Sequence, residues 1–405
     1  MKLNKIICLA SLLAACSYLS AAPSFSGAIG GSAGADLNVP LNGGKAKGRV
    51  PLAAYAAIQA NLAEWAIFRG EIAAWASNLS FDDIFSDSDA NVRLNELSFV
   101  LQRRAVTATN YFSAFVGAYE PIGGDAFLMR HFGIEPIGSR LTKSYTSLEG
   151  SPLRDNAKGA GLSYVVNFDK APIATGVSFY FNKNKSDDWS MNLDSRFALA
   201  TNLVTMDFML GFGSPIQDKY RDKDVVLVID TITMHGGLNF LAGSKYTHGL
   251  LLQMYLNDIV IKGDRKNGVT GNDISFLLEP RLKFHAFNFT LTLYSFTQKA
   301  IKELTYLKDP IGAGFTFYKD NIEGKNGDIT VGIHAFTGIA NLSFGDLTKG
   351  KNVNDAKYNV YITPYAEFPL SGSASLETIA QVGILDVSGS QSLNFTLTVG
   401  GKKTF

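Results

Sequence analysis

Few residues of this chain have the types and spacing that catalytic or metal chemistry requires. The stretch "GGSAG", from Gly30 to Gly34, fits the pattern G-x-S-x-G around Ser32, but a serine nucleophile on that motif needs a sharp turn between a strand and a helix. Here the motif lies in a run of small residues that predicts a strand. The five histidines have no close metal-ligand spacing, and no cysteine cluster accompanies them. We therefore expect no enzyme, no metal site and no cofactor.

A charged row along one segment indicates another kind of chemistry, the binding or passage of polar solutes. In "LLEPRLKFHAF", Glu279, Arg281 and Lys283 alternate with apolar residues, and His285 continues the row. Successive side chains of a strand point to opposite faces, so the ionisable groups share one face and the apolar groups share the other. Unpaired charge is too costly to bury in an apolar core, so the charged face must contact water. A soluble sheet and the lumen of a membrane barrel would both provide that contact.

The first residues indicate export from the cytoplasm. "MKLNKIICLASLLAACSYLSAAPSF" has a basic start, an apolar stretch and then small residues, which is the layout of a secretory signal peptide over residues 1–22. As an alternative, "LAAC", from Leu13 to Cys16, resembles the lipobox of bacterial lipoproteins, and Cys16 would then be lipidated. Both cysteines, Cys8 and Cys16, lie in this leader, so the mature chain has no disulfide framework.

After the leader, residues 23–405 form one predicted domain in which the dominant period is two. We predict eighteen strands, at 25–38, 51–64, 67–79, 92–104, 108–120, 157–168, 171–182, 188–199, 202–213, 225–240, 246–260, 272–286, 287–299, 310–319, 326–342, 355–368, 372–386 and 391–405. For the segment 50–68 alone an amphipathic helix is the rival interpretation, because Tyr55, Ile58, Leu62 and Trp65 are spaced for one helix face. No mature segment has the roughly 18 uninterrupted apolar residues of a membrane-spanning helix.

The connections between these segments favour a membrane barrel over a soluble sheet. They alternate between tight ones, such as "FDKA" and "LATN", and long charged ones, such as "GSPIQDKYRDKD" and "SFGDLTKGKNVNDA". Outer-membrane barrels have short periplasmic turns and longer outer loops, and an even strand count places both termini on the periplasmic side. The sequence therefore predicts an all-β fold, a transmembrane antiparallel up-and-down β-barrel of about 16–18 strands, with 18 preferred. A net charge of +1 gives no indication of nucleic-acid binding.

The end of the chain resembles the assembly signal of bacterial outer-membrane barrel proteins. In "QSLNFTLTVGGKKTF" the terminal Phe405 follows an alternating strand with Phe395, Leu397 and Val399 on its apolar face. Gly401 and Lys403 depart from that signal, whose corresponding positions are usually apolar or aromatic. The resemblance implies insertion into the bacterial outer membrane by the barrel-assembly machinery, with outer-membrane lipids around the apolar face.

The connection at 121–156 resembles the third loop of the general diffusion porins, which follows the fifth strand and folds into the barrel. In "YEPIGGDAFLMRHFGIEPIGSRL", Pro121, Gly123, Gly124 and Asp125 match the Pro-Glu-Phe-Gly-Gly-Asp-like turn of that loop, and Ile122 stands where two residues are expected. The resemblance implies a porin through which small hydrophilic solutes or ions diffuse passively. The oligomeric state stays open, with a homotrimer as one alternative.

An inward fold of this loop predicts the residues of a pore constriction. On the loop these are Asp125, Arg130, Glu135 and Arg140, and on the wall they are Arg104, Arg196, Glu279, Arg281 and Lys283. We expect the carboxylates of Asp125 and Glu135 to face basic wall residues, because facing charges at a constriction set ion preference. Alternatives are a solvated outer loop, a surface adhesin or structural barrel anchored at Cys16, and a transporter of hydrophobic substrates. The sequence does not identify the solute.

Overall fold

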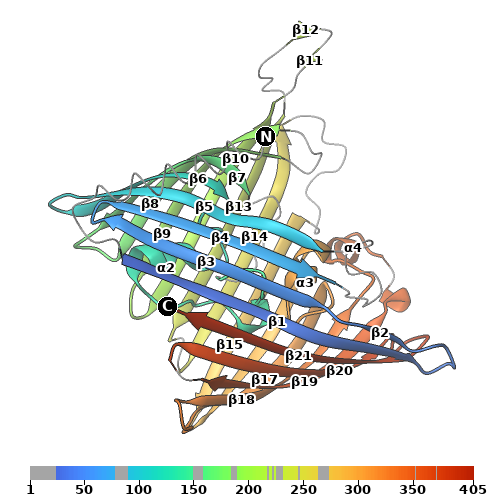
Figure 1. Cartoon of the computed structure of the whole chain (residues 1–405). Helices are drawn as coiled ribbons and strands as arrows, with labels where there is room; N and C mark the ends of the chain where they lie inside the picture. The colour runs from blue at the N-terminus through green and yellow to red at the C-terminus, as the bar shows by residue number, and fades with distance from the viewer. Residues whose placement is uncertain are drawn as a thin grey trace.

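One antiparallel sheet closed on itself forms the body of the molecule (Figure 1). The computed structural model describes residues 24–77, 90–148, 158–183, 189–216, 219–220, 223–224, 231–244, 247–262, 273–351, 353–370 and 372–405. The predicted signal peptide and Cys16 lie outside the described residues, as do residues 149–156 of the predicted constriction loop.

The sheet contains the eighteen long strands that the period-two pattern predicts. They are β1 (Ser24–Pro40), β3 (Leu52–Ala63), β4 (Ala66–Ala76), β5 (Asn91–Arg104), β6 (Ala108–Gly117), β7 (Gly159–Phe168), β8 (Ile173–Lys183), β9 (Trp189–Ala200), β10 (Val204–Pro215), β13 (Ile232–Gly243), β14 (Gly249–Lys262), β15 (Ile274–Phe284), β16 (Phe287–Ser295), β17 (Ile311–Ile322), β18 (Ile329–Ile339), β19 (Tyr358–Pro369), β20 (Ala374–Leu385) and β21 (Ser392–Thr404). A short strand, β2 (Lys47–Arg49), pairs with the end of β1, and β11 (Lys219–Tyr220) pairs with β12 (Lys223–Asp224) apart from the barrel.

The first and last strands close the ring. β1 pairs with β21 in one continuous antiparallel register, from Ala28 opposite Thr404 to Pro40 opposite Ser392. The backbone N–H of Phe405 donates to the Gly27 carbonyl oxygen at 3.0 Å, and the Gly27 N–H donates back to Phe405 at 2.9 Å. Each long strand therefore has a neighbour on both sides. A closed barrel of this kind satisfies its backbone hydrogen bonds between strands and needs no water to do so.

The two faces of each strand differ as the alternation predicts. On β21, the side chains of Phe395, Leu397 and Val399 are exposed on the outside of the barrel. On β15, Glu279 and Arg281 are buried on the inside. Exposed apolar side chains recur in this way on the outer face of strands around the barrel. That surface suits lipid, because a soluble protein rarely exposes so large an apolar area.

The connections also alternate as predicted. Tight turns lie at the end of the barrel where β1 begins and β21 ends, and long connections lie at the opposite end (Figure 1). The connection at 323–328 belongs to the end with the tight turns. The helical interpretation of 50–68 is wrong, because residues 52–63 form β3, which pairs with β1 on one side and β4 on the other.

Three predicted strands differ from the structure in detail. The predicted strand at 287–299 ends at Ser295, and helix α3 (Gln298–Glu303) follows it. The strand predicted at 225–240 is β13, which begins at Ile232. His285 adopts a positive φ of 54° in the turn after β15, so it does not continue the charged row of that strand.

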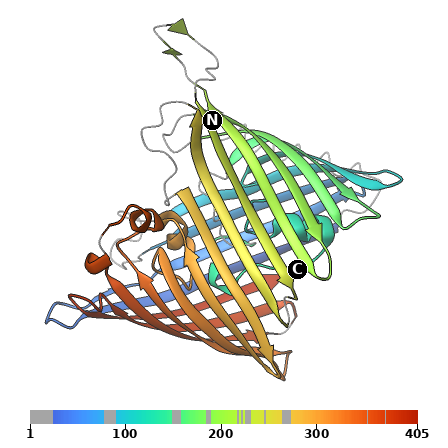
Figure 2. The ribbon, with the colours of Figure 1, turned by 180° about the vertical axis from the view of Figure 1, so that it is seen from behind.

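The helices of the described residues are short. Besides α3 they are α2 (Ala126–Phe132), α4 (Phe344–Thr348) and the 3-10 turns η2 (Arg140–Thr142) and η4 (Val353–Asp355). Within the described ranges, no helix has the length and apolar character needed to cross a membrane. Helix α2 lies within the ring of strands, whereas α4 lies at the end with the long connections (Figures 1 and 2).

The closed ring predicts a specific response to heat. The barrel should resist sodium dodecyl sulfate at room temperature and unfold on boiling. No strand of a closed ring can separate without breaking its hydrogen bonds to both neighbours, so the ring unfolds as a unit. Boiled and unboiled samples should therefore migrate differently on a denaturing gel. A variant that lacks residues 392–405 leaves one edge of β1 and one edge of β20 unpaired and should migrate identically in both conditions. Identical migration of the full-length protein would contradict the closed barrel.

Candidate constriction site

Residues 118–148, which we call the first inward segment, cross the interior of the barrel. On one side, Arg130 forms an ion pair with Glu96 of β5 at 2.7 Å. On the other side, Ser139 donates to Glu279 of β15 at 2.6 Å, and Arg140 donates to Glu377 of β20 at 2.9 Å. β5 and β15 are far apart around the ring. The segment therefore contacts both sides of the lumen.

The start of the first inward segment is held by buried charge. Glu120 is buried and lies 3.7 Å from Arg130 and 3.2 Å from His131 of the segment itself. The guanidinium of Arg196, on β9, donates to the Glu120 backbone carbonyl and pairs with Asp207 of β10 at 2.5 Å. Burial alone would raise the pKa of the Glu120 carboxyl, but His131, Arg130 and Arg196 together lower it to about 2. Glu120 therefore stays charged across the physiological pH range.

An apolar cluster fixes helix α2 inside the barrel. Ile122, Phe127 and Leu128 are almost completely buried against inward-facing side chains of the wall. The guanidinium of Arg196 lies over the ring of Phe127, 4.3 Å from its centroid. Such apolar side chains on an exposed loop would lose their favourable burial. Their packing explains why the segment stays in the lumen.

Asp125, the first predicted constriction residue, holds the shape of the segment. Its carboxylate accepts a hydrogen bond from the Gly138 backbone N–H at 2.7 Å and from the Asn239 amide of β13 at 3.0 Å. The side chain is buried. These contacts join the two arms of the segment to each other and to the wall.

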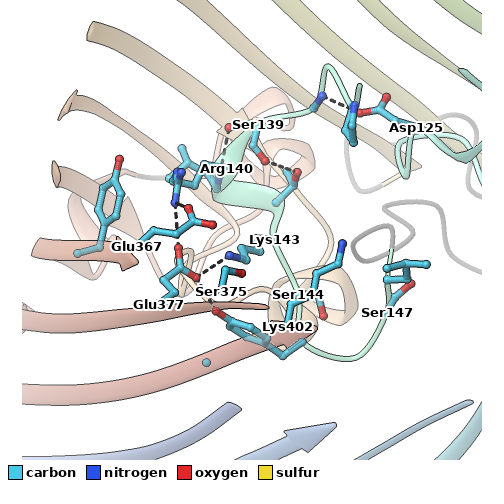
Figure 3. A pocket seen from close by; sticks show the side chains of 18 of the residues that line it. Asp125, Ser139, Arg140, Lys143, Ser144, Ser147, Glu367, Ser375, Glu377 and Lys402 are labelled. Atoms are coloured by element: carbon cyan, nitrogen blue, oxygen red, sulfur yellow. Dashed lines mark hydrogen bonds and ion pairs between the residues drawn. The ribbon is translucent and has the colours of Figure 1, made fainter. Parts of the chain in front are cut away.

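The far half of the segment borders a cavity of about 500 Å³. The opposite side of this cavity is the inner wall formed by β15 to β21 and β3. Arg140 and Lys143 lie at its edge and point to Glu377, with Glu367 of β19 beside them (Figure 3). Hydroxyl side chains make up much of the remaining lining: Ser139, Thr142, Ser144, Ser147, Thr290, Thr316 and Ser375.

Glu377 receives several donors at once. Arg140 lies at 2.9 Å, Lys143 at 2.8 Å and the Tyr145 hydroxyl at 2.5 Å. Room for the Tyr145 ring is provided by Gly400 of β21, because a Cβ atom at that position would overlap the ring. The last strand of the barrel thus accommodates the end of the first inward segment.

A second inward segment, residues 296–310, completes this contact. The Tyr306 hydroxyl donates to Glu377 at 2.7 Å, and the Thr305 N–H donates to the Lys143 carbonyl oxygen at 3.1 Å. Glu303, at the end of α3, pairs with Arg93 of β5 at 2.7 Å. This segment was not predicted from the sequence. Its signal was the spacing of Ile301, Leu304 and Leu307, all of which are buried.

The structure separates the other predicted site residues. Arg281 pairs with Glu279 at 2.8 Å and donates to the Gly138 carbonyl, so both lie against the first inward segment. Lys283 lies 3.7 Å from Asp320 on the neighbouring strand β17. Arg104 does not reach the segment.

Arg104 and Glu135 show the limits of the prediction most clearly. The Arg104 side chain is 79% exposed at the turn after β5, and its nearest acidic group is Asp169 at 3.9 Å. Glu135 is exposed on the segment itself. At the cavity the signs of charge are the reverse of our expectation: Arg140 and Lys143 of the segment face carboxylates of the wall.

The part of the chain that the structure describes contains no group of three or more His, Cys, Asp and Glu side chains that could hold a metal ion. What the site offers instead is fixed charge and hydroxyl groups around a cavity of about 500 Å³. Such a lining can bind or select polar solutes.

Comparison with solved structures identifies the class of fold. The chain is similar to the outer membrane protein OpdK from Pseudomonas aeruginosa, with a TM-score of 0.51 and 8% identity over 94% of this chain and 99% of OpdK. It is similar to OpdL of the same organism, with a TM-score of 0.50 and 9% identity over 94% and 99% of the two chains. A structure of OpdK with vanillate gives a TM-score of 0.50 and 9% identity over the same shares.

At this identity the likeness concerns the fold. The chain has the closed, porin-like β-barrel fold of these outer-membrane proteins. No family model matches the sequence, and no curated protein matches it.

The buried charges predict a large effect of one arginine. Replacing Arg130 by Met leaves the buried carboxylates of Glu96 and Glu120 without this cation. Removing one partner from a buried ion pair costs about 3–5 kcal/mol, so the free energy of unfolding should fall by that amount. Urea titration of the barrel in lipid vesicles measures it.

Arg104→Met is the matched control. It removes the same charge from an exposed side chain, so the free energy of unfolding should change by less than about 0.5 kcal/mol. Equal effects of the two substitutions would show that the Arg130 contacts do not hold the segment.

Proposed function

We propose that this barrel is a passive channel for small hydrophilic solutes or ions, and that the first inward segment narrows it. The observation that carries the proposal is the cavity of about 500 Å³ between that segment and the wall. Its volume is within the range of small-molecule sites, about 300–1,000 Å³. Its lining of paired charges and hydroxyl groups suits a polar solute.

The similar structures support the same class of function. A protein with this fold, OpdK, has been seen with a small molecule, vanillate. The proposal for this chain names only the class of solute, a small hydrophilic molecule or ion. It includes no catalytic step.

Loss of the first inward segment should widen the channel. Replacing residues 124–145 by a short glycine linker removes α2, Arg140 and Lys143 from the lumen, so the single-channel conductance in planar bilayers should rise. Deleting residues 344–349, which comprise α4 and the residue after it, removes no residue that lines the cavity and should leave the conductance unchanged. A folded 124–145 variant with wild-type conductance would exclude the segment from the mechanism.

Export and insertion belong to the same proposal. The signal peptide at 1–22 would direct the chain across the inner membrane, and Phe405 would present it to the barrel-assembly machinery. Phe405 also closes the seam through its two backbone hydrogen bonds with Gly27.

Deleting Phe405 should therefore lower the amount of heat-modifiable protein in outer-membrane fractions while leaving export unchanged. The conservative variant Phe405→Tyr keeps a terminal aromatic residue and the backbone contacts, so its insertion should stay near the wild-type level. Undiminished insertion of the deletion variant would contradict this role of the terminus.

A further inference from the structure

One wall residue, Glu377, is shared by the two inward segments. Arg140, Lys143 and Tyr145 reach it from the first segment, and Tyr306 reaches it from the second. The carboxylate itself is buried, with a residue exposure of 2%. Its partners are separated from it by 71 to 237 residues of chain, so the contact exists only in the folded barrel.

The donors around Glu377 fix its charge. Two of them are cations, and two are phenol groups that donate hydrogen bonds through their hydroxyls. Burial, followed by the charge of Glu377, raises the pKa of Tyr145 and of Tyr306 well above the ordinary value, so both phenols keep their protons. A carboxyl group that accepts from all of these donors is an anion. Charge-assisted hydrogen bonds of this kind are stronger than neutral ones.

The same contact contributes to the charge that a solute meets in the cavity. The side chains of Arg140 and Lys143 are 30% and 33% exposed, whereas Glu377 is enclosed behind them. Glu367, which is 31% exposed, also pairs with Arg140 at 2.8 Å. Two cations and two carboxylates therefore cancel at this edge of the cavity. These four groups together add little net charge at this edge, and the cavity is also lined by Asp125, Glu279, Arg281 and Lys402.

We propose that Glu377 is a specificity-determining residue of the channel: it neutralises Arg140 and Lys143 and holds both inward segments against the wall. The inference rests on the proposed channel function. Both the charge selection and the width of the channel then depend on the carboxylate of Glu377. The channel with Glu377 in place discriminates weakly between small anions and cations.

The test compares two substitutions that remove the same charge from the same group of residues. In E377Q the cations keep only Glu367, and Tyr306 loses its anionic acceptor. In E367Q the cations keep Glu377, and the second inward segment keeps its contact. Reversal potentials in a potassium chloride gradient give the anion-to-cation permeability ratio, and single-channel recordings give the conductance and its fluctuations.

We expect both variants to raise the anion-to-cation permeability ratio, by about twofold or more, because each leaves one uncompensated cation at the passage. Only E377Q should also raise the conductance and its fluctuations, because only this variant weakens the contact between Tyr306 of the second inward segment and the wall. E377Q with the selectivity and recordings of the wild type would overturn the inference. So would an E377Q variant that behaves identically to E367Q.

A second pair of variants covers the case in which E377Q does not fold. K143M removes one cation and should shift the permeability ratio toward cations, and an unchanged ratio would overturn the proposal. Y306F removes a single hydroxyl group and should raise the fluctuations without changing the ratio. Heat-dependent migration on gels verifies the fold of each variant. A wild-type protein that forms no channels would refute the proposed function itself, whereas a conducting wild type with indifferent variants refutes only this inference.

Discussion

In a lipid bilayer no water is present to bond an exposed peptide group, so every strand must find partners within the protein. The eighteen strands meet this requirement by pairing in a ring that the register of β1 and β21 closes. The same register decides which side chains contact lipid and which line the lumen. It therefore builds the polar inner wall on which both inward segments depend.

Inside that wall, apolar packing and charge act together. Ile122, Phe127 and Leu128 bury their surface against wall residues and hold α2 in the lumen. The ion pair of Arg130 with Glu96 and the donors around Glu377 fix the position of the segment relative to particular strands. Apolar packing tolerates small displacements, whereas a buried ion pair with one partner removed costs about 3–5 kcal/mol. The charged contacts therefore determine the position of the first inward segment more strictly than the apolar packing does.

The sequence predicted the strands well because each one carries its own signal. Lipid on one side and water on the other impose a period of two along every strand, and eighteen long strands follow from it. The partners across the lumen have no such signal. That Arg140 contacts Glu377 depends on the closure of the whole ring, and residues 237 positions apart show no periodicity. For this reason Arg104 was predicted to face the loop from the wall. It is instead the last residue of β5, at the end of the barrel with the tight turns.

The fit between Tyr145 and Gly400 has a consequence for the order of events during assembly. Tyr145 is synthesised long before β21, and its acceptor Glu377 lies 232 residues further along the chain. Contacts of such separation form late in folding, because a long loop must close first. The ring of Tyr145 can therefore pack against Gly400 only after β21 has joined the sheet. The contacts at the end of the first inward segment therefore depend on the closure of the ring by β21.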